Sequence, residues 1–173
     1  MLLPSMKMEA ERMLESIERN RIDKITYYLD IAETVSKRST CLKRHYGAII
    51  VKNSEIISTG YNGAPRGITN CIDKCKCNRE SCARGTGYEN CIAVHAEMNS
   101  IISSSRKDML ESSLYLVGLE RDGSYVKDPE PCSICKKIIV NAGIKYVYVR
   151  INKEKYKVIV VNNWERENLI GGY

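Results

Sequence analysis

One pair of short motifs constrains this chain more than any other feature. The first is the H-x-E triplet His95-Ala96-Glu97, and the second is the P-C-x-x-C segment at 131–135, which contains Cys132 and Cys135. A catalytic zinc takes three protein ligands and keeps one coordination position open. His95, Cys132 and Cys135 supply three such ligands, and Glu97 is left over to move protons. Each motif alone is weak, since a C-x-x-C can also be a redox pair or half of a structural zinc site, but together they predict a catalytic zinc centre.

Both motifs lie where helices are expected to start. Residues 95–105 carry apolar side chains at helical spacing. Residues 132–142 form a second periodic segment between Pro131 and Gly143, with Ile134, Ile138 and Ile139 on its apolar side. A helix N-terminus has free backbone N–H groups and a partial positive charge, which favour ionised thiolates. Positions two apart do not share a helix face. We therefore expect the histidine to face the metal and the glutamate to point towards water and substrate.

Length and composition limit the possible architecture and the expected cellular compartment. The 173 residues suffice for one domain with a single core, and the 43% hydrophobic and 28% charged residues are ordinary for a soluble protein. No apolar run reaches membrane-spanning length and no signal peptide is visible, so we expect a cytoplasmic protein without membrane contact. There, the C-x-x-C spacings favour metal binding over disulfides. The net charge of +6 suits an anionic partner such as a nucleotide phosphate, and equally a solvated basic surface.

Hydrophobic periodicity predicts an α/β domain at residues 24–173, preceded by an extension at 1–23 with helix-forming composition. Strands are expected at 47–51, 55–61, 113–119, 145–149 and 158–161, and helices at 24–37, 95–105, 132–142 and 164–169. Helices alternate with strands after the first hairpin. This order predicts a mixed sheet of about five strands with helices on both faces.

The stretch at 68–93 is rich in cysteines and poor in core residues. It holds Cys71, Cys75, Cys77, Cys82 and Cys91, together with many charges. A segment that cannot bury a core of its own needs a cross-link to stabilise it, and a zinc ion bound by four protein ligands is one such cross-link. We expect four of the five thiols to bind a second, structural zinc, with free thiols as the alternative. The spacing alone does not say which cysteine is spare.

The chain resembles deoxycytidylate (dCMP) deaminases of the cytidine deaminase superfamily, a branch that includes competence-operon proteins. The resemblance covers about residues 24–165. It rests on the segments CLKR at 41–44, GAIIV at 47–51, TGYNGAPRG at 59–67, HAEMN at 95–99 and PCSIC at 131–135, and on the cysteine insertion. The loop at 62–67 follows an expected strand, where an α/β fold keeps substrate contacts, although a plain turn has the same composition.

The resemblance implies a three-layer cytidine deaminase-like fold and the zinc-dependent hydrolysis of dCMP to dUMP and ammonia, which feeds dTTP supply. It implies that Glu97 moves protons between water, ring nitrogen N3 and the leaving amine. Asn62 would hold the sugar or base edge, and Arg44 and Arg66 the 5′-phosphate, because guanidinium groups suit phosphate geometry. It implies a homo-oligomer, with a hexamer favoured, and control by dCTP and dTTP.

The family's insertion cysteines match Cys71, Cys77 and Cys91, which leaves Cys82, or Cys75 in its place, as the expected fourth ligand of the second zinc. Other functions stay open beside the first. The protein could deaminate another cytosine nucleotide or a tRNA adenosine, or it could be a non-enzymatic zinc protein of competence. A strand-binding face needs stacking aromatics, and the single tryptophan and absent phenylalanine speak against nucleic acid. The intact Glu97 speaks against a purely structural site.

Overall fold

The computed structural model describes residues 4–19, 21–83 and 85–166. The strands are β1 (Arg44–Lys52), β2 (Glu55–Tyr61), β3 (Ser113–Glu120), β4 (Tyr146–Arg150) and β5 (Tyr156–Val160). The helices are α1 (Pro4–Arg19), α2 (Lys24–Ser36), α3 (Cys71–Lys74), α4 (Ala96–Ile102), α5 (Arg106–Met109), α6 (Ser133–Ala142) and α7 (Asn162–Arg166), with a 3-10 turn η1 (Tyr88–Asn90).

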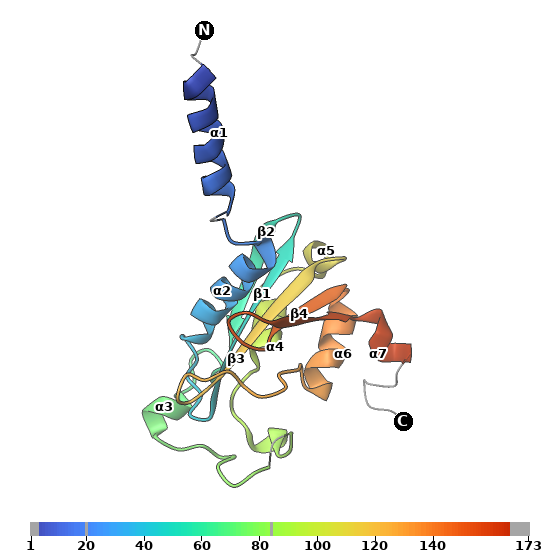
Figure 1. Cartoon of the computed structure of the whole chain (residues 1–173). Helices are drawn as coiled ribbons and strands as arrows, with labels where there is room; N and C mark the ends of the chain where they lie inside the picture. Colours follow the sequence, from blue (N-terminus) through green and yellow to red (C-terminus); the bar gives the residue numbers. More distant parts are fainter. Residues whose placement is uncertain (1–3, 20, 84, 167–173) are drawn as a thin grey trace.

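The five strands form one sheet in the order β2-β1-β3-β4-β5 (Figure 1). Strand β1 runs antiparallel to both β2 and β3, and β4 runs antiparallel to β5. Strands β3 and β4 are parallel, and their crossover connection contains α6. The sheet is therefore mixed, as the alternation of elements predicts.

Helices cover both faces of this sheet. On one face α2 packs Leu29 and Ala32 against inward residues of β1 and β3. On the other face α4 and α6 pack Ala96 and Ile139 against alternate residues of β1, β3 and β4. Successive side chains of a strand point to opposite faces, so the continuous apolar run of β1 serves both cores. The predicted α/β fold, with about five strands and helices on both faces, is confirmed.

Local signals explain most element boundaries. The side chain of Asp23 caps α2 by accepting hydrogen bonds from the backbone N–H groups of Ile25 and Thr26. Asn53 and Ser54 join β1 to β2 with positive φ angles of 51° and 67°, which the tight turn of such a hairpin requires. Gly143 ends α6 at a φ of 80°, in the left-handed conformation expected for a C-terminal glycine.

Three expectations about helices need correction. The helix expected at 95–105 ends at Ile102, and Ser105 starts α5 by accepting a hydrogen bond from the N–H of Asp108. Serines compete with the helical ladder in this way, which explains the break. Ile134, expected on the buried side of α6, is 43% exposed. The closing helix expected at 164–169 is α7 at Asn162–Arg166, and residues 167–169 lie outside the described part.

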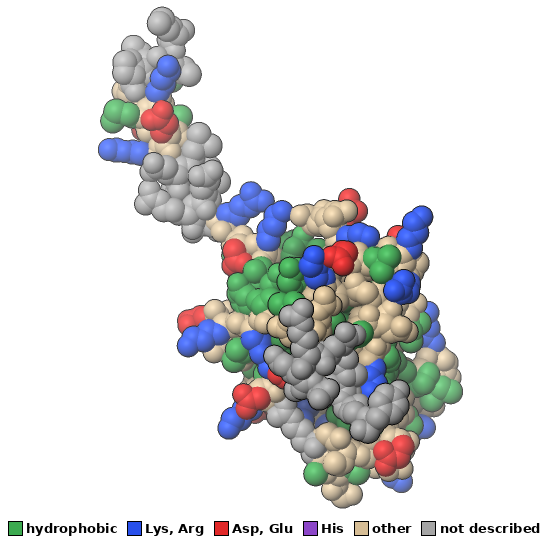
Figure 2. All heavy atoms as spheres, turned by 90° about the vertical axis from the view of Figure 1, so that its right-hand side faces the viewer, with side chains coloured by type: hydrophobic (Ala, Val, Ile, Leu, Met, Phe, Trp, Pro, Cys, Tyr) green, Lys and Arg blue, Asp and Glu red, His purple; other side chains and the backbone are tan. Residues whose placement is uncertain are grey.

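Helix α1 stands apart from the sheet and its covering helices in both views (Figures 1 and 2). Its residues Met6, Met8 and Met13 are exposed. No helix in the described ranges is both long and apolar enough to cross a membrane. On the face seen in Figure 2, lysines and arginines are spread among acidic and neutral side chains rather than gathered in one basic patch.

Candidate metal centre and active site

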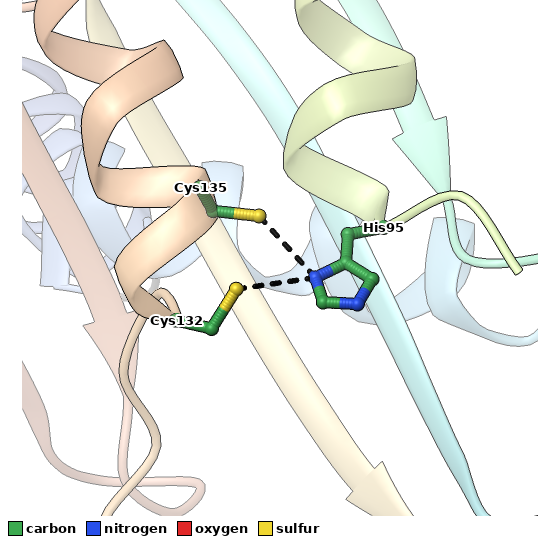
Figure 3. A group of neighbouring side chains, drawn as sticks. All are labelled: His95, Cys132 and Cys135. Atoms are coloured by element: carbon green, nitrogen blue, oxygen red, sulfur yellow. Dashed lines mark hydrogen bonds between the residues drawn. The ribbon is translucent and has the colours of Figure 1, made fainter. Parts of the chain in front are cut away.

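The starts of α4 and α6 bring His95, Cys132 and Cys135 together (Figure 3). The Nδ1 atom of His95 lies 3.4 Å from the Sγ of Cys132 and 3.3 Å from the Sγ of Cys135. With zinc–nitrogen bonds of about 2.0 Å and zinc–sulfur bonds of about 2.3 Å, tetrahedral geometry places ligand nitrogen and sulfur about 3.5 Å apart. The spacing and the chemistry of these three donors therefore fit zinc.

Backbone geometry explains why these side chains face one another. His95 and Cys132 are the N-cap residues of α4 and α6, with extended backbone conformations. Neither side chain caps its own helix, so both are free to point into the gap between the helices. Two helix N-termini thus meet at the thiols, and their partial positive charges favour the ionised form.

The two thiols titrate as a coupled pair. The hydrogen bond from the Cys135 thiol, opposed by burial and helped by His95, lowers the pKa of Cys132 to about 4. The same hydrogen bond and burial raise the pKa of Cys135 well above its usual value. The hydrogen bond with Cys132 also raises the pKa of His95, against the effect of burial. The metal-free site therefore holds protons that a bound cation would displace.

Glu97 lies beside this centre without belonging to the ligand group. Its side chain belongs to the first turn of α4 and the residue is only 5% exposed. Burial raises the pKa of Glu97 above its usual range, while the nearby positive charge of His95 opposes the shift. A buried carboxyl group beside a site for attacking water is placed to take a proton and to give it back.

Close packing against β2 fixes the position of α4. A Cβ atom at Gly60 would lie 2.3 Å from the backbone nitrogen of Ser100 and 2.4 Å from the backbone oxygen of Ala96. The Nδ2 atom of Asn99 donates to the carbonyl oxygen of Tyr61 at 2.7 Å. Glycine at position 60 therefore lets the helix that carries His95 and Glu97 approach the sheet closely.

The centre opens into a cavity of about 770 Å³, which is large enough for a nucleotide-sized ligand. Asn62 and Arg44 line it, whereas Arg66 is exposed and lies outside its wall. The Oδ1 of Asn62 accepts from Ser39 and from the N–H of Tyr46, and its Nδ2 donates to the carbonyl oxygen of Arg44. An amide has two N–H donors, so one is left for a ligand.

Arg44 is already engaged by a carboxylate. Its Nε lies 2.9 Å and 3.0 Å from the two carboxylate oxygens of Glu120, which also lines the cavity. A substrate phosphate would have to compete with that ion pair. The structure thus brings only one of the two expected phosphate-binding arginines to the cavity and finds it paired.

The insertion cysteines do not form a second compact ligand group in the described residues, where the only such group is His95, Cys132 and Cys135. Burial raises the pKa of Cys71, and the charges of Cys41, Cys91 and Cys77 raise it further, so these thiols share one neighbourhood. Cys75 is exposed. Sequence reasoning missed Cys41, although it stands in the CLKR segment that carries the resemblance.

Two further residues of the insertion reach the cavity without a sequence signal. The ring of Tyr88 packs edge-on against the ring of His95, with 5.1 Å between the ring centroids. The guanidinium of Arg79 lies over the ring of Tyr88, 4.3 Å from the ring centroid. Both line the cavity. Only the folded insertion brings Tyr88 against His95 and Arg79 against Tyr88.

Comparisons with known proteins agree with this geometry. Residues 22–151 match the cytidine and deoxycytidylate deaminase zinc-binding region. Deoxycytidylate deaminase of Mycobacterium phage D29 is 33% identical over 133 residues, which make up 74% of this chain and 94% of the phage protein. Deoxycytidylate deaminase of Schizosaccharomyces pombe is 34% identical over 124 residues, 70% of this chain but only 35% of the yeast protein. The chain thus spans about a third of that longer relative.

A solved structure shows the same fold. The crystal structure of dCMP deaminase from the cyanophage S-TIM5, in complex with dCMP and dUMP, superposes with a TM-score of 0.54 and 32% identity. The superposition covers 72% of this chain and 78% of the phage chain. This similarity confirms the expected cytidine deaminase-like architecture. With the family match across residues 22–151 and the His-Cys-Cys centre beside Glu97, the chain belongs to the cytidine and deoxycytidylate deaminase zinc-binding family.

Proposed function

We propose that this protein is a zinc-dependent hydrolase that converts dCMP and water to dUMP and ammonia, in the supply of pyrimidine deoxynucleotides for dTTP. The observation that carries the proposal is the buried Glu97 beside a His-Cys-Cys centre, in the wall of a nucleotide-sized cavity. A structural zinc site has no use for an adjacent proton carrier. The names of the relatives, deoxycytidylate deaminases, support the choice of nucleotide.

His95, Cys132 and Cys135 are the proposed ligands of the catalytic zinc, which supplies a Lewis acid that lowers the pKa of water. Glu97 accepts the first proton of the attacking water and delivers it to N3 of the ring. It then accepts the second proton from the new hydroxyl on C4 and delivers it to the departing amine. The water oxygen forms a bond with C4, and the bond between C4 and the exocyclic nitrogen breaks. Burial of Glu97 suits both halves of this task because it raises the pKa of the carboxyl.

Asn62, Arg44 and Arg66 remain the substrate contacts proposed from the resemblance. The spare N–H of Asn62 in the cavity wall supports a contact with the sugar or base edge. Arg44 supports a phosphate contact only if Glu120 yields to the substrate. Arg66, exposed outside the cavity wall, has the weakest support and serves equally well as an effector or subunit contact.

A second, structural zinc in the insertion is also proposed. The sequence-based ligand set is Cys71, Cys77 and Cys91 with Cys82, or with Cys75 in its place. The electrostatic neighbourhood of Cys71 supports Cys41 as the fourth thiol, ahead of Cys82 and of the exposed Cys75. Metal analysis should then find two zinc ions per chain, and one in a chain that lacks Cys71.

Several coarser features accompany the enzyme proposal. We propose one deaminase domain at 24–173 with an extension at 1–23, a cytoplasmic location, a homo-oligomer with a hexamer favoured, and control by dCTP and dTTP. Ile102 is 72% exposed on α4 and Ile134 is 43% exposed on α6, and apolar helix faces of this kind support subunit contacts. Light scattering with and without dCTP tests the oligomer and the effector together.

The test is a parallel assay of ammonia release from dCMP, dCTP, deoxycytidine and a tRNA anticodon stem-loop by zinc-loaded protein. Turnover of dCMP above the other three supports the proposal. Release from the stem-loop alone overturns it in favour of a tRNA adenosine deaminase. No ammonia release from any of the four compounds, with zinc bound and dCTP added as effector, overturns the proposal in favour of a non-enzymatic role.

A further inference from the structure

The cavity wall contains four cationic side chains, and their partners differ. Arg44 is paired with Glu120. The ammonium of Lys43 donates to the carbonyl oxygen of Arg79 at 2.7 Å and approaches the carbonyl oxygens of two further insertion residues at 3.4 Å. Lys43 therefore anchors the insertion. Arg121 is exposed at the rim, in the turn after β3. Arg79 remains as the partly buried cation to consider.

Arg79 is held in place by contacts with Tyr88 and with a backbone carbonyl group. Its guanidinium lies 4.3 Å from the ring centroid of Tyr88, and its Nε donates to the carbonyl oxygen of Thr86 at 2.9 Å, with Nη2 donating to the same oxygen. A guanidinium has five N–H donors in a fixed fork, so most of them stay available. In the described residues no ion pair joins Arg79 to a carboxylate, including the neighbouring Glu80. A fixed, unneutralised guanidinium suits a phosphate.

The same contacts place Arg79 at the right part of the cavity. Tyr88 bridges the guanidinium to the ring of His95, so Arg79 lies one aromatic ring away from the proposed metal centre. A nucleotide with its cytosine ring at the centre would extend its sugar and phosphate along the cavity, whose wall includes Arg79 and Tyr88. Cys77 and Cys91 flank the segment with Arg79 and Tyr88, and the proposed thiol cluster would hold both ends of that segment.

We propose that Arg79, held by Tyr88, is the specificity-determining residue that binds the 5′-phosphate of the nucleotide. The inference rests on the proposed function for the class of reaction but assigns a residue that the sequence patterns do not. It makes the cysteine-stapled insertion a part of the substrate site, in which Tyr88 is a positioning residue. In this assignment Arg79 takes the phosphate contact that the resemblance gave to Arg44 and Arg66, and Arg44 stays paired with Glu120 at the start of β1.

The test compares Arg79→Gln with wild type on dCMP and on deoxycytidine, which lacks the phosphate. Losing a hydrogen bond to a charged group should lower the preference for dCMP about 10- to 100-fold, mainly through KM. Arg106→Gln is the matched control, because the Nε of Arg106 also donates to a backbone carbonyl but on α5, outside the cavity wall. Tyr88→Phe keeps the ring and should keep the preference, whereas Tyr88→Leu should lose part of it.

Calorimetric binding of dUMP and of deoxyuridine provides a readout that does not depend on turnover. Arg79→Gln should weaken dUMP binding and leave the much smaller affinity for deoxyuridine nearly as it was. Equal losses of affinity for dUMP and deoxyuridine would show a structural role for Arg79 and overturn the inference. The inference would also fall if Arg121→Gln or Arg44→Gln, and not Arg79→Gln, removed the preference for dCMP over deoxycytidine. Failure of the wild type to deaminate any cytosine compound would instead count against the proposed function, and the binding comparison would still decide the role of Arg79.

Discussion

Replacing Glu97 by glutamine removes the proposed proton carrier while changing little else. The amide has the size of the carboxyl group, and Glu97 is not one of the three clustered ligands. Positioned acid–base groups contribute about 10²- to 10⁴-fold to rate. This corresponds to about 2.7–5.4 kcal/mol of activation free energy. Because Glu97 is only 5% exposed, bulk water has little access to replace it, and we expect a loss near the upper end.

The assay measures ammonia release from saturating dCMP across a pH series. Burial raises the pKa of Glu97, and the carboxylate form is needed to accept a proton from water, so wild-type activity should decline on the acid side at a pH above the usual glutamate pKa. Glu97→Gln should lack that decline and should bind as much zinc as the wild type. Glu111→Gln is the control, since Glu111 pairs with Lys145 on the surface with its side chain 72% exposed.

Stability separates a catalytic loss from an unfolding loss. A carboxyl group whose folded pKa is raised binds its proton more tightly when folded, so its ionisation lowers stability as pH rises. The zinc-free Glu97→Gln variant should therefore be at least as stable as wild type at neutral pH, and the difference should vanish in acid. Retention of a tenth or more of wild-type turnover, or loss of zinc, would refute the assigned role of Glu97.

Three other perturbations test the site and its support. Gly60→Ala forces a Cβ into the backbone of α4, and we expect a loss of about 1–3 kcal/mol in unfolding free energy together with reduced turnover, checked by denaturant titration and the ammonia assay. Arg150 is 2% exposed and joins β4 to α2 through ion pairs with Asp30 and Glu33. Arg150→Ala should lower the unfolding free energy by about 3 kcal/mol and the Tm by about 6–12 °C in a thermal melt. An unchanged Tm would contradict this. Zinc affinity, measured by competition with a chelator, should fall by at least about tenfold per pH unit below neutrality. The reason is that the proton shared by Cys132 and Cys135 must leave before the metal binds. An affinity that does not change with pH would show that both thiols are already ionised.

The features that sequence predicts best are local. The hairpin turn at Asn53 and Ser54 and the end of α6 at Gly143 each depend on a few adjacent residues, and the structure contains both. The clustering of His95, Cys132 and Cys135 was predictable too, because the histidine and the cysteine pair each lie on one short segment at a helix start. Two such segments leave few ways to complete a zinc site.

What sequence does not predict depends on contacts between distant segments. The approach of Cys41 to Cys71, and of Arg79 and Tyr88 to His95, arises only when the insertion folds back over the start of β1. Lys43 makes that fold-back by bonding carbonyl oxygens 36 and more residues away. The exposure of Ile134 was missed for another reason: apolar spacing finds a helix, but the neighbouring elements decide which side it buries.

The most direct test of the central claim is the conversion of dCMP by zinc-loaded protein in water enriched in oxygen-18, followed by mass spectrometry of the nucleotide. Hydrolytic attack at C4 predicts dUMP that carries one oxygen-18 atom, formed in equal amount with ammonia. Unlabelled product, or no dUMP from protein with zinc bound at His95, Cys132 and Cys135, would contradict the assignment of this site to the hydrolytic deamination of dCMP.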